Sequence, residues 1–505
     1  MKTEKAWQEL LSHTRPLRDL TGVSYLIAWD QEVLMPEGGA GARSAQAGVI
    51  SSLMHEKLTG KPLQGALARL VDLKTGEPVA GGLSPARRDS LRELPRRWAR
   101  ARKLPNTHVS EAATLYSQAQ ADWARAKHAR DFKIFLPALR RIVAVKRREA
   151  ALLARGAHPY DSLLDEFEPG TTVAQLDPLF ARLGPAVRDL AAAARKRPVP
   201  RGVPRLDRPP TREEARAVAG FSRELVAEMG FDFTRGRIDS AEHPSTTALH
   251  PHDVRFTVRR RPQSVLDDVF TCLHEGGHAL YDQGLDPQWW GTPMAEYVSL
   301  GVHESQSRLW ENVVGRSREF WRPRLPRLAR AVPALRGVPL DAFMAALWRV
   351  SPERLRLESD EVTYNLHIVL RYELEKSLIT GDLEAADVPR AWSEKLFSLL
   401  GLRPRHEAEG CLQDVHWAGG SIGYFPTYVL GNLCASQLFE AYQSERPRWR
   451  EDFAPGRLTA LTRWLNEKVH KHGARYPAPR LIERATGRPL AADAFLAHLR
   501  RRYAD

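Results

Sequence analysis

A histidine, a glutamate and a second histidine, His274, Glu275 and His278, have the residue types and spacing of a metal-dependent hydrolytic site. On a helix, residues at positions i and i+4 project from the same face, so both imidazoles can reach one metal ion. Glu275 can lie beside the metal without binding it, where it can take a proton from the attacking water and pass it to the departing amine. The pattern predicts a catalytic zinc site.

A catalytic zinc normally takes a third protein ligand and leaves one coordination position open. Four downstream residues can supply that ligand, namely Glu296, His303, Glu304 and Glu311. The stretch 294–314 has helical spacing, so an adjacent antiparallel helix could deliver a carboxylate. Spacing alone leaves the four candidates open. Two histidines and a carboxylate suit zinc, although cobalt fits the same ligands.

The metal motif requires a helix, and the apolar periodicity predicts one over 265–281, with Gly284 as a plausible terminator. Gly276 and Gly277 lie inside it, at a cost of about 1 kcal/mol each relative to alanine. A close approach of substrate or of a neighbouring backbone explains that cost, and so does tight helix packing. Cys272 lies about 200° around the helix from His274 and is expected to be an ordinary buried thiol.

Helical periodicity dominates the rest of the chain, including 110–128 and 132–156, with a loop at 196–211. The one persuasive strand is 253–259, in which apolar and polar residues alternate. We therefore expect a mainly α fold, a single unit over residues 1–505 with one small β-sheet near the zinc helix. The metal region covers about 240–430.

The chain of 505 residues carries 75 basic and 61 acidic residues, a net charge of +14. The arginines lie in segments with helical apolar spacing, which favours solvated helix faces over a nucleic-acid-binding surface. We find no secretory signal and no apolar run long enough to span a membrane. Three widely spaced cysteines argue against a disulfide scaffold. These features predict a soluble cytoplasmic protein.

His303-Glu304-Ser305, 25 residues beyond His278, resembles the third-ligand motif of the carboxypeptidase Taq family of metallocarboxypeptidases. Other stretches resemble that family in the same order along nearly the whole chain. They are Trp29 to Glu32, Met35 to Gly38, Tyr160-Asp161 to Gly170, Asp253 to Thr257, Leu355 to Asp360, and Gly410 to Trp417. Several motifs in matching order are far more specific than any one of them.

The resemblance implies that Glu304 is the third metal ligand and that cobalt can support activity in place of zinc. It implies an almost wholly helical, saddle-like fold with a deep groove, usually as a homodimer. It also implies removal of single amino acids from peptides with a free C-terminus, with broad tolerance except for proline and often acidic residues. Three stretches depart from the family pattern, His243-Pro244-Ser245, 248–252 and 355–360, and they put substrate preference in doubt.

A carboxypeptidase must distinguish a terminal carboxylate from a mid-chain amide, and a planar guanidinium does this through two parallel hydrogen bonds. Arg356 and Arg255 are the candidates. In a helix expected over about 352–376, Arg356, Asp360, Thr363 and His367 would form one polar line. For Arg356, the alternative to binding the substrate carboxylate is an exposed salt bridge with Asp360. For Arg255, the alternative is a purely structural pair with Asp253.

Peptide hydrolysis also passes through an oxyanion, which a hydrogen-bond donor near the metal can stabilise. The candidates are Tyr424, Tyr428, His416 and His243, although single tyrosines and histidines are more often structural. Two other functions stay open. One is an endopeptidase or oligopeptidase with a similar helical groove, and the other is a non-catalytic, basic nucleic-acid-binding protein.

Overall fold

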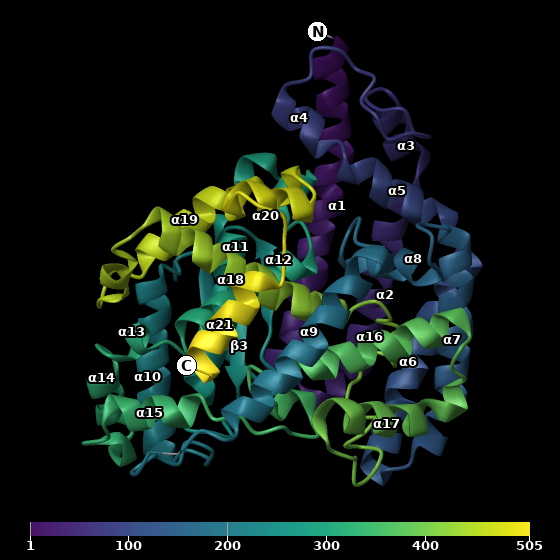
Figure 1. Cartoon of the computed structure of the whole chain (residues 1–505). Coiled ribbons are helices and arrows are strands. Elements are labelled where there is room, and N and C mark those ends of the chain that lie inside the picture. Colours follow the sequence, from purple (N-terminus) through teal and green to yellow (C-terminus); the bar gives the residue numbers. More distant parts are fainter. Residues whose placement is uncertain (1, 199, 505) are drawn as a thin grey trace.

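The computed structural model describes residues 2–198 and 200–504, and most of them are helical (Figure 1). The N-terminal helices are α1 (Lys2–Val33), α2 (Ala40–Thr59), α3 (Lys61–Ala68), α4 (Pro85–Ser90), α5 (Glu93–Lys103), α6 (Asn106–Ala129), α7 (Leu136–Leu153), α8 (Pro159–Phe167), α9 (Val173–Ala194) and α10 (Arg212–Met229). The expected helices 110–128 and 132–156 are α6 and α7, the latter preceded by a short 3-10 turn. The expected loop lies between α9 and α10 at its described residues, 196–198 and 200–211, and residue 199 lies outside the described part.

The second half of the chain supplies the other helices. They are α11 (Asp267–Gly284), α12 (Leu300–Arg308), α13 (Arg318–Trp321), α14 (Leu325–Ala331), α15 (Leu340–Leu347), α16 (Tyr364–Thr380), α17 (Val388–Leu400), α18 (Pro426–Glu445), α19 (Thr459–Lys468), α20 (Ala478–Thr486) and α21 (Asp493–Tyr503). A π-helix, Leu309–Val314, continues α12 directly. No helix among the described residues is long and apolar enough to cross a membrane.

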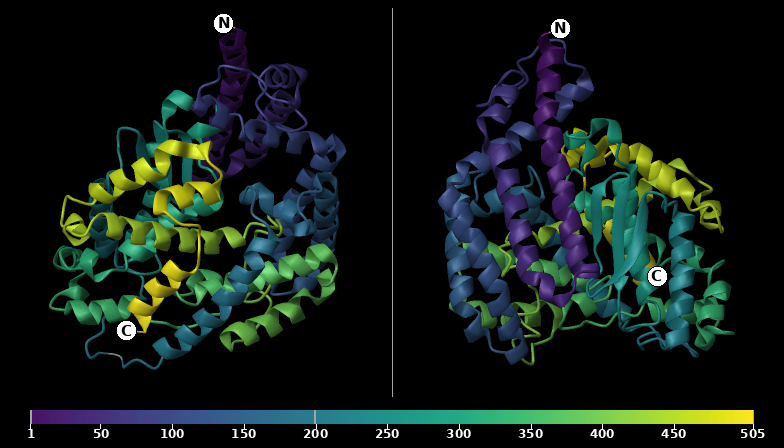
Figure 2. Two further views of the ribbon diagram at one scale, coloured as in Figure 1. Left: turned by 45° about the horizontal axis from the view of Figure 1, so that its top comes forward. Right: turned by 180° about the vertical axis from the view of Figure 1, so that it is seen from behind.

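Three strands form one sheet in the order β1-β3-β2. They are β1 (Gly236–Ala241), β2 (Thr246–His250) and β3 (Asp253–Arg259). β3 has the predicted bounds, pairs parallel with β1, and pairs antiparallel with β2. Val254 and Phe256 point into the core and are fully buried, as the alternation predicts. The sheet packs against α11 on one side, and the long α1 runs beside it on the other (Figure 2, right).

Two large apolar clusters form the core, and α18 contributes to both. One gathers α6 to α9, α16, α17 and α21, and the other gathers β3 and the helices around α11 and α12. A smaller third cluster lies under the start of α1, with α3 and α5. The three cysteines are free and buried, so Cys272 is the inert thiol that its helix position predicts. The protein is thus mainly α with one small sheet beside the helix that carries the metal motif.

One expected helix is wrong. Residues 352–363 do not continue α16, because only a 3-10 turn forms at Arg356–Glu358 before the helix begins at Tyr364. Asp360 accepts hydrogen bonds from the backbone N–H groups of Val362 and Thr363, as a side chain does at a helix start. The predicted polar line from Arg356 to His367 therefore does not exist.

Candidate metal centre

His274 and His278 project from α11 toward Glu304 on α12, and the three side chains offer ligand atoms within 4.8 Å of one another. The Oε2 atom of Glu304 lies 3.3 Å from His278 Nε2 and 3.8 Å from His274 Nε2. Two imidazole nitrogens and one carboxylate oxygen converging on one point match the donor set of a catalytic zinc site. Of the four candidate third ligands, Glu304 is the one that lies with both histidines.

Close helix packing explains the two glycines of the motif. A Cβ atom on Gly277 would lie 2.5 Å from the backbone oxygen of Gln306 on α12, a distance that no side chain tolerates. Gly276 instead faces the flexible side chain of Met229, 3.3 Å away. On the far side of α12, Gly431 of α18 would likewise meet Glu304. The missing side chains let three helices approach closely enough to bring Glu304 to the histidines.

The other three third-ligand candidates have different partners. Glu311, on the π-helix, lies 2.7 Å from Nδ1 of His274, the ring nitrogen opposite the metal side. Glu296 accepts a hydrogen bond from Arg97 at 2.7 Å. His303 lies 3.2 Å from Asp282 through its Nε2 atom, and its ring stacks on that of His278.

Arg308 connects the two carboxylates that contact His274. Its guanidinium donates to Glu304 Oε1 at 2.7 Å and to Glu311 Oε2 at 3.1 Å. Burial would raise the pKa of Glu304, but Arg308 and the two histidines outweigh it and hold that pKa well below its usual range. Burial lowers the pKa of His278 to about 4, which keeps the imidazole neutral, as a metal ligand requires. Sequence reasoning did not identify Arg308.

Glu275 lies in the same cavity, called here the metal pocket, which is also lined by Ser245, Thr246 and Leu300. The hydroxyl of Thr246, at the start of β2, donates to Glu275 Oε2 at 2.7 Å. Burial is the main cause that raises the pKa of Glu275 above its ordinary value. A carboxylate that is held in place and has an increased proton affinity is well suited to general-base work.

Tyr424 and Tyr428 line the metal pocket, where a donor to the oxyanion would have to lie. Burial raises the pKa of Tyr424 to about 12, so its hydroxyl remains protonated and able to donate a hydrogen bond. His416 lies beside them, with its Nε2 atom 3.4 Å from the Tyr428 hydroxyl. Glu375 accepts hydrogen bonds from Trp417 and from the backbone of Gly423, which fixes the loop between His416 and these tyrosines.

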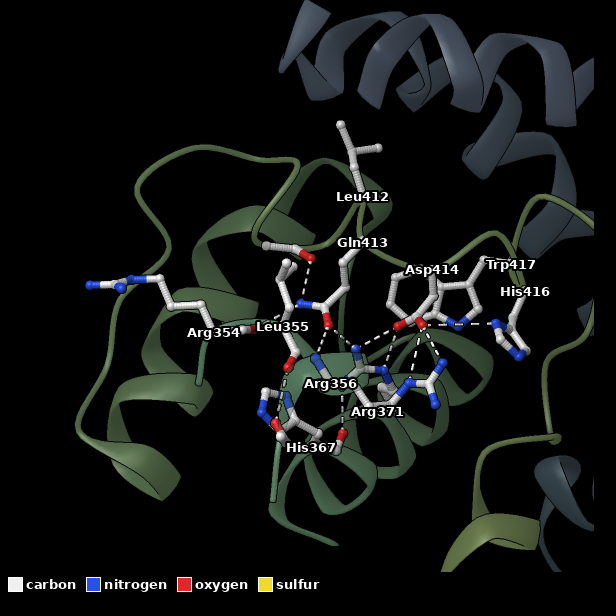
Figure 3. A network of polar contacts seen from close by, with 12 residues as sticks. Arg354, Leu355, Arg356, His367, Arg371, Leu412, Gln413, Asp414, His416 and Trp417 are labelled. Atoms are coloured by element: carbon white, nitrogen blue, oxygen red, sulfur yellow. Dashed lines mark hydrogen bonds and ion pairs between the residues drawn. The ribbon is translucent and has the colours of Figure 1, made fainter. Parts of the chain in front are cut away.

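Arg356 is buried behind Tyr428, with its guanidinium carbon 5.0 Å from that ring. Asp360, its partner in the salt-bridge alternative, accepts hydrogen bonds from Ser351, Val362 and Thr363. Asp414 lies between Arg356 and Arg371 instead, accepting from both guanidinium groups, as Figure 3 shows. The two arginines overcome burial and hold the pKa of Asp414 well below its usual range. Asp414 is therefore charged, and it fixes the plane of the Arg356 guanidinium.

The geometry does not favour Arg255 as the carboxylate-binding residue or His243 as the oxyanion donor. Arg255 forms a bidentate pair with Asp253, at 2.8 Å for both hydrogen bonds, and stacks over Trp29 of α1. That arrangement matches the structural alternative for this arginine. His243 has an exposed side chain and does not line the metal pocket. Its backbone oxygen accepts a hydrogen bond from the Thr257 hydroxyl, and its imidazole has no hydrogen-bond partner among the described residues.

Comparisons with known proteins agree with this geometry. Residues 9–503 match the family model described as carboxypeptidase Taq (M32) metallopeptidase. Thermostable carboxypeptidase 1 of Thermus thermophilus is 39% identical over 100% of this chain and 99% of its own length. Carboxypeptidase 1 of Bacillus subtilis is 33% identical over 95% of this chain and 94% of its own. The crystal structure of the M32 carboxypeptidase from Deinococcus radiodurans superimposes with a TM-score of 0.91 at 36% identity, covering 99% of both chains. This chain therefore belongs to the carboxypeptidase Taq (M32) family of metallopeptidases and is a metallocarboxypeptidase.

Proposed function

We propose that this metallocarboxypeptidase is a zinc enzyme that releases single amino acids from the free C-termini of peptides. The convergence of His274, His278 and Glu304 beside Glu275 is the observation that carries this proposal. These three side chains would hold the metal, and cobalt fits the same donor set. When bound, the metal would supply Lewis-acid polarisation and lower the pKa of the attacking water.

Glu275 would act as the general base and then as the general acid. Its carboxylate would take the proton from the attacking water and then deliver it to the amine of the leaving amino acid. The hydrogen bond from Thr246 leaves the second carboxylate oxygen, Oε1, available for this transfer. The raised pKa of Glu275 supports a role in which the group holds the proton between the two steps.

Arg356 would bind the terminal carboxylate of the substrate. Its Nε and Nη2 atoms donate to Asp414, and Nη1 donates to the Tyr364 hydroxyl at 2.8 Å. A guanidinium has five N–H donors, so one remains on each terminal nitrogen. Arg255 is the weaker candidate, because its carboxylate partner Asp253 already takes the bidentate side.

Tyr424 and Tyr428 would donate to the oxyanion, since both hydroxyl-bearing side chains line the metal pocket. His416, hydrogen-bonded to Tyr428, would orient that hydroxyl. From the family resemblance we further propose broad side-chain tolerance that excludes C-terminal proline, assembly as a homodimer, and a cytoplasmic location.

The test compares N-blocked peptides that end in a free carboxylate with the same peptides amidated at the C-terminus. We expect release of the last amino acid from the free acid only, and no turnover by Glu275→Gln in parallel. Equal cleavage of both forms at an internal bond would contradict the proposal and favour the endopeptidase alternative.

A further inference from the structure

A second cavity, of about 320 Å³, opens beside the metal pocket and shares Thr246, Leu300 and His303 with it. Arg18 of α1 and His250 at the end of β2 both line this cavity, called here the Arg18 pocket. α1 reaches this position because Gly22 packs directly on the backbone of β2, where a Cβ atom would lie 2.9 Å from the Leu249 oxygen. The long N-terminal helix thus forms one wall of the groove next to the reaction site.

Arg18 brings a positive charge with uncommitted donors into this pocket. Its side chain is 16% exposed, and no described residue accepts a hydrogen bond from its guanidinium group. The Nε atom is buried without a partner, and the nearest carboxylate oxygen, on Glu296, is 3.9 Å away. The guanidinium carbon also lies 5.1 Å from the centroid of the Trp290 ring, a cation–π contact. A buried N–H donor without an acceptor, such as that of the Arg18 Nε atom, costs free energy unless a ligand supplies the acceptor.

The acidic side chains of the Arg18 pocket already have partners. Asp282 lies 3.2 Å from the His303 ring, and Glu296 is bound by Arg97 at 2.7 Å. Among the described residues, Arg18 has only a long ionic contact with Glu296, at 3.9 Å, and no hydrogen-bond acceptor, whereas both carboxylates have closer partners. The chemistry that it fits is a carboxylate, which accepts two hydrogen bonds from one guanidinium.

The place of the pocket says which part of a substrate would reach it. A carboxypeptidase substrate has one residue beyond the scissile bond, and the rest of its chain extends the other way. Arg356 lies behind Tyr428, whereas the Arg18 pocket joins the metal pocket through Thr246 and His303, and Tyr428 does not line it. If the proposed function holds, the substrate residues that precede the C-terminal residue lie beside Arg18.

We propose that Arg18 forms a specificity subsite that binds an acidic side chain located N-terminal to the scissile bond. The enzyme then prefers peptides with glutamate at one of the positions before the released residue. This preference is independent of the identity of the released residue, which the Arg356 side of the metal pocket receives.

The experiment uses N-blocked tetrapeptides that share one C-terminal residue and carry a single glutamate, glutamine or lysine at each of the three preceding positions. kcat/KM is measured for the zinc-loaded wild type, Arg18→Gln, Arg18→Lys and the matched control Arg390→Gln. Arg390 is 63% exposed on α17, and its replacement by glutamine removes one positive charge outside both pockets. A blocked dipeptide serves as a short substrate that reports carboxypeptidase activity by itself.

For the wild type we expect kcat/KM about tenfold higher with glutamate than with glutamine at one position, the effect of one charge-assisted hydrogen bond. Arg18→Gln should abolish this preference while still cleaving the blocked dipeptide, and Arg18→Lys should retain part of it. Arg390→Gln should behave as the wild type. Equal rates with glutamate and glutamine at all three positions, or an unchanged preference in Arg18→Gln, would overturn the inference. Failure of the wild type to cleave the blocked dipeptide would instead overturn the proposed function.

Discussion

Glu311 Oε2 lies 2.7 Å from Nδ1 of His274, so a carboxylate contacts the nitrogen of this imidazole that faces away from the metal side. The π-helix Leu309–Val314 carries Glu311 and follows α12 without a break. His278 differs, because its Nδ1 atom is buried and has no hydrogen-bond partner among the described residues. The two histidines of the motif are therefore oriented by different means. The hydrogen bond fixes the His274 tautomer with Nε2 free to bind metal.

Replacing Glu311 with glutamine should weaken metal binding by about 10- to 100-fold, the usual effect of losing a partner behind a metal-bound histidine. The measurement is the Kd for zinc by competition with a chromophoric chelator. Glu319→Gln, on α13 and outside the metal pocket, is the matched control and should keep the wild-type Kd. An unchanged Kd in Glu311→Gln would show that this contact does not orient His274.

Glu275→Gln should remove turnover while leaving metal content unchanged, because Glu275 lies beside the three proposed metal ligands but outside that cluster. Glutamine keeps the shape of the side chain but cannot accept the water proton. Metal analysis of the purified variant, together with kcat on a blocked dipeptide, checks both halves. A variant that kept full activity would exclude Glu275 as the base.

Arg356→Gln should remove the discrimination between free and amidated C-termini. The positive partner of the substrate carboxylate is lost, whereas Arg371 still pairs with Asp414 and keeps that buried carboxylate neutralised. We expect KM for the free acid to rise by at least about tenfold, as for a lost charge-assisted hydrogen bond. KM for a free-acid substrate and its amide, in both proteins, is the readout. Unaltered KM for the free acid would move the carboxylate-binding role to Arg255.

The two glycines of the metal motif give a prediction with an internal control. Gly277→Ala should destabilise the protein by about 1–3 kcal/mol or more, because the new methyl group meets the rigid backbone of Gln306. Gly276→Ala should change stability by no more than about 1 kcal/mol, because Met229 can move and alanine favours the helix. Urea unfolding of both variants measures the difference. Equal stabilities would mean that α11 and α12 can separate without cost.

The sequence predicted the parts of this protein that depend on periodicity and spacing. The bounds of β3, the helix around His274 and His278, and the burial of Cys272 follow from patterns of two or 3.6 residues. The four candidate third ligands illustrate the limit. All of them follow the motif at plausible distances, and only the packing of α11 on α12 through Gly277 separates Glu304 from the others.

The contacts of Arg356 and Glu311 show why other parts of the site could not be predicted from the sequence. The Asp360 side chain holds the segment before α16 by accepting hydrogen bonds from the backbone N–H groups of Ser351 and Thr363. Such bonds compete with helix formation, although the polar residues recur at helical intervals. Asp414, the partner of Arg356, is 58 residues away in sequence, so no local pattern connects them. The π-helix that turns Glu311 toward His274 leaves no signature in the residue types of 309–314.

Acid should destabilise the protein partly through His367. This histidine is fully buried, and burial, followed by the charge of Arg371, lowers its pKa to about 3. In the unfolded chain the pKa is near 6.5, so below about pH 6.5 the unfolded state binds a proton that the folded state does not. Because the folded pKa is depressed, the contribution of this histidine to stability is complete above pH 6.5. It is lost as the pH falls, by about 1.4 kcal/mol per pH unit.

Urea unfolding between about pH 7 and about pH 5 measures this slope. His367→Gln preserves a donor toward the Glu353 oxygen, the hydrogen-bond partner of Nε2, but cannot titrate. Its free energy of unfolding should therefore fall with decreasing pH less steeply than that of the wild type, by about 1.4 kcal/mol per pH unit below pH 6. The control is His128→Gln on α6, where the histidine is exposed and the slope should not change. If His367→Gln and the wild type lost stability in parallel, His367 would have to be protonated inside the folded protein, against the contacts that surround it.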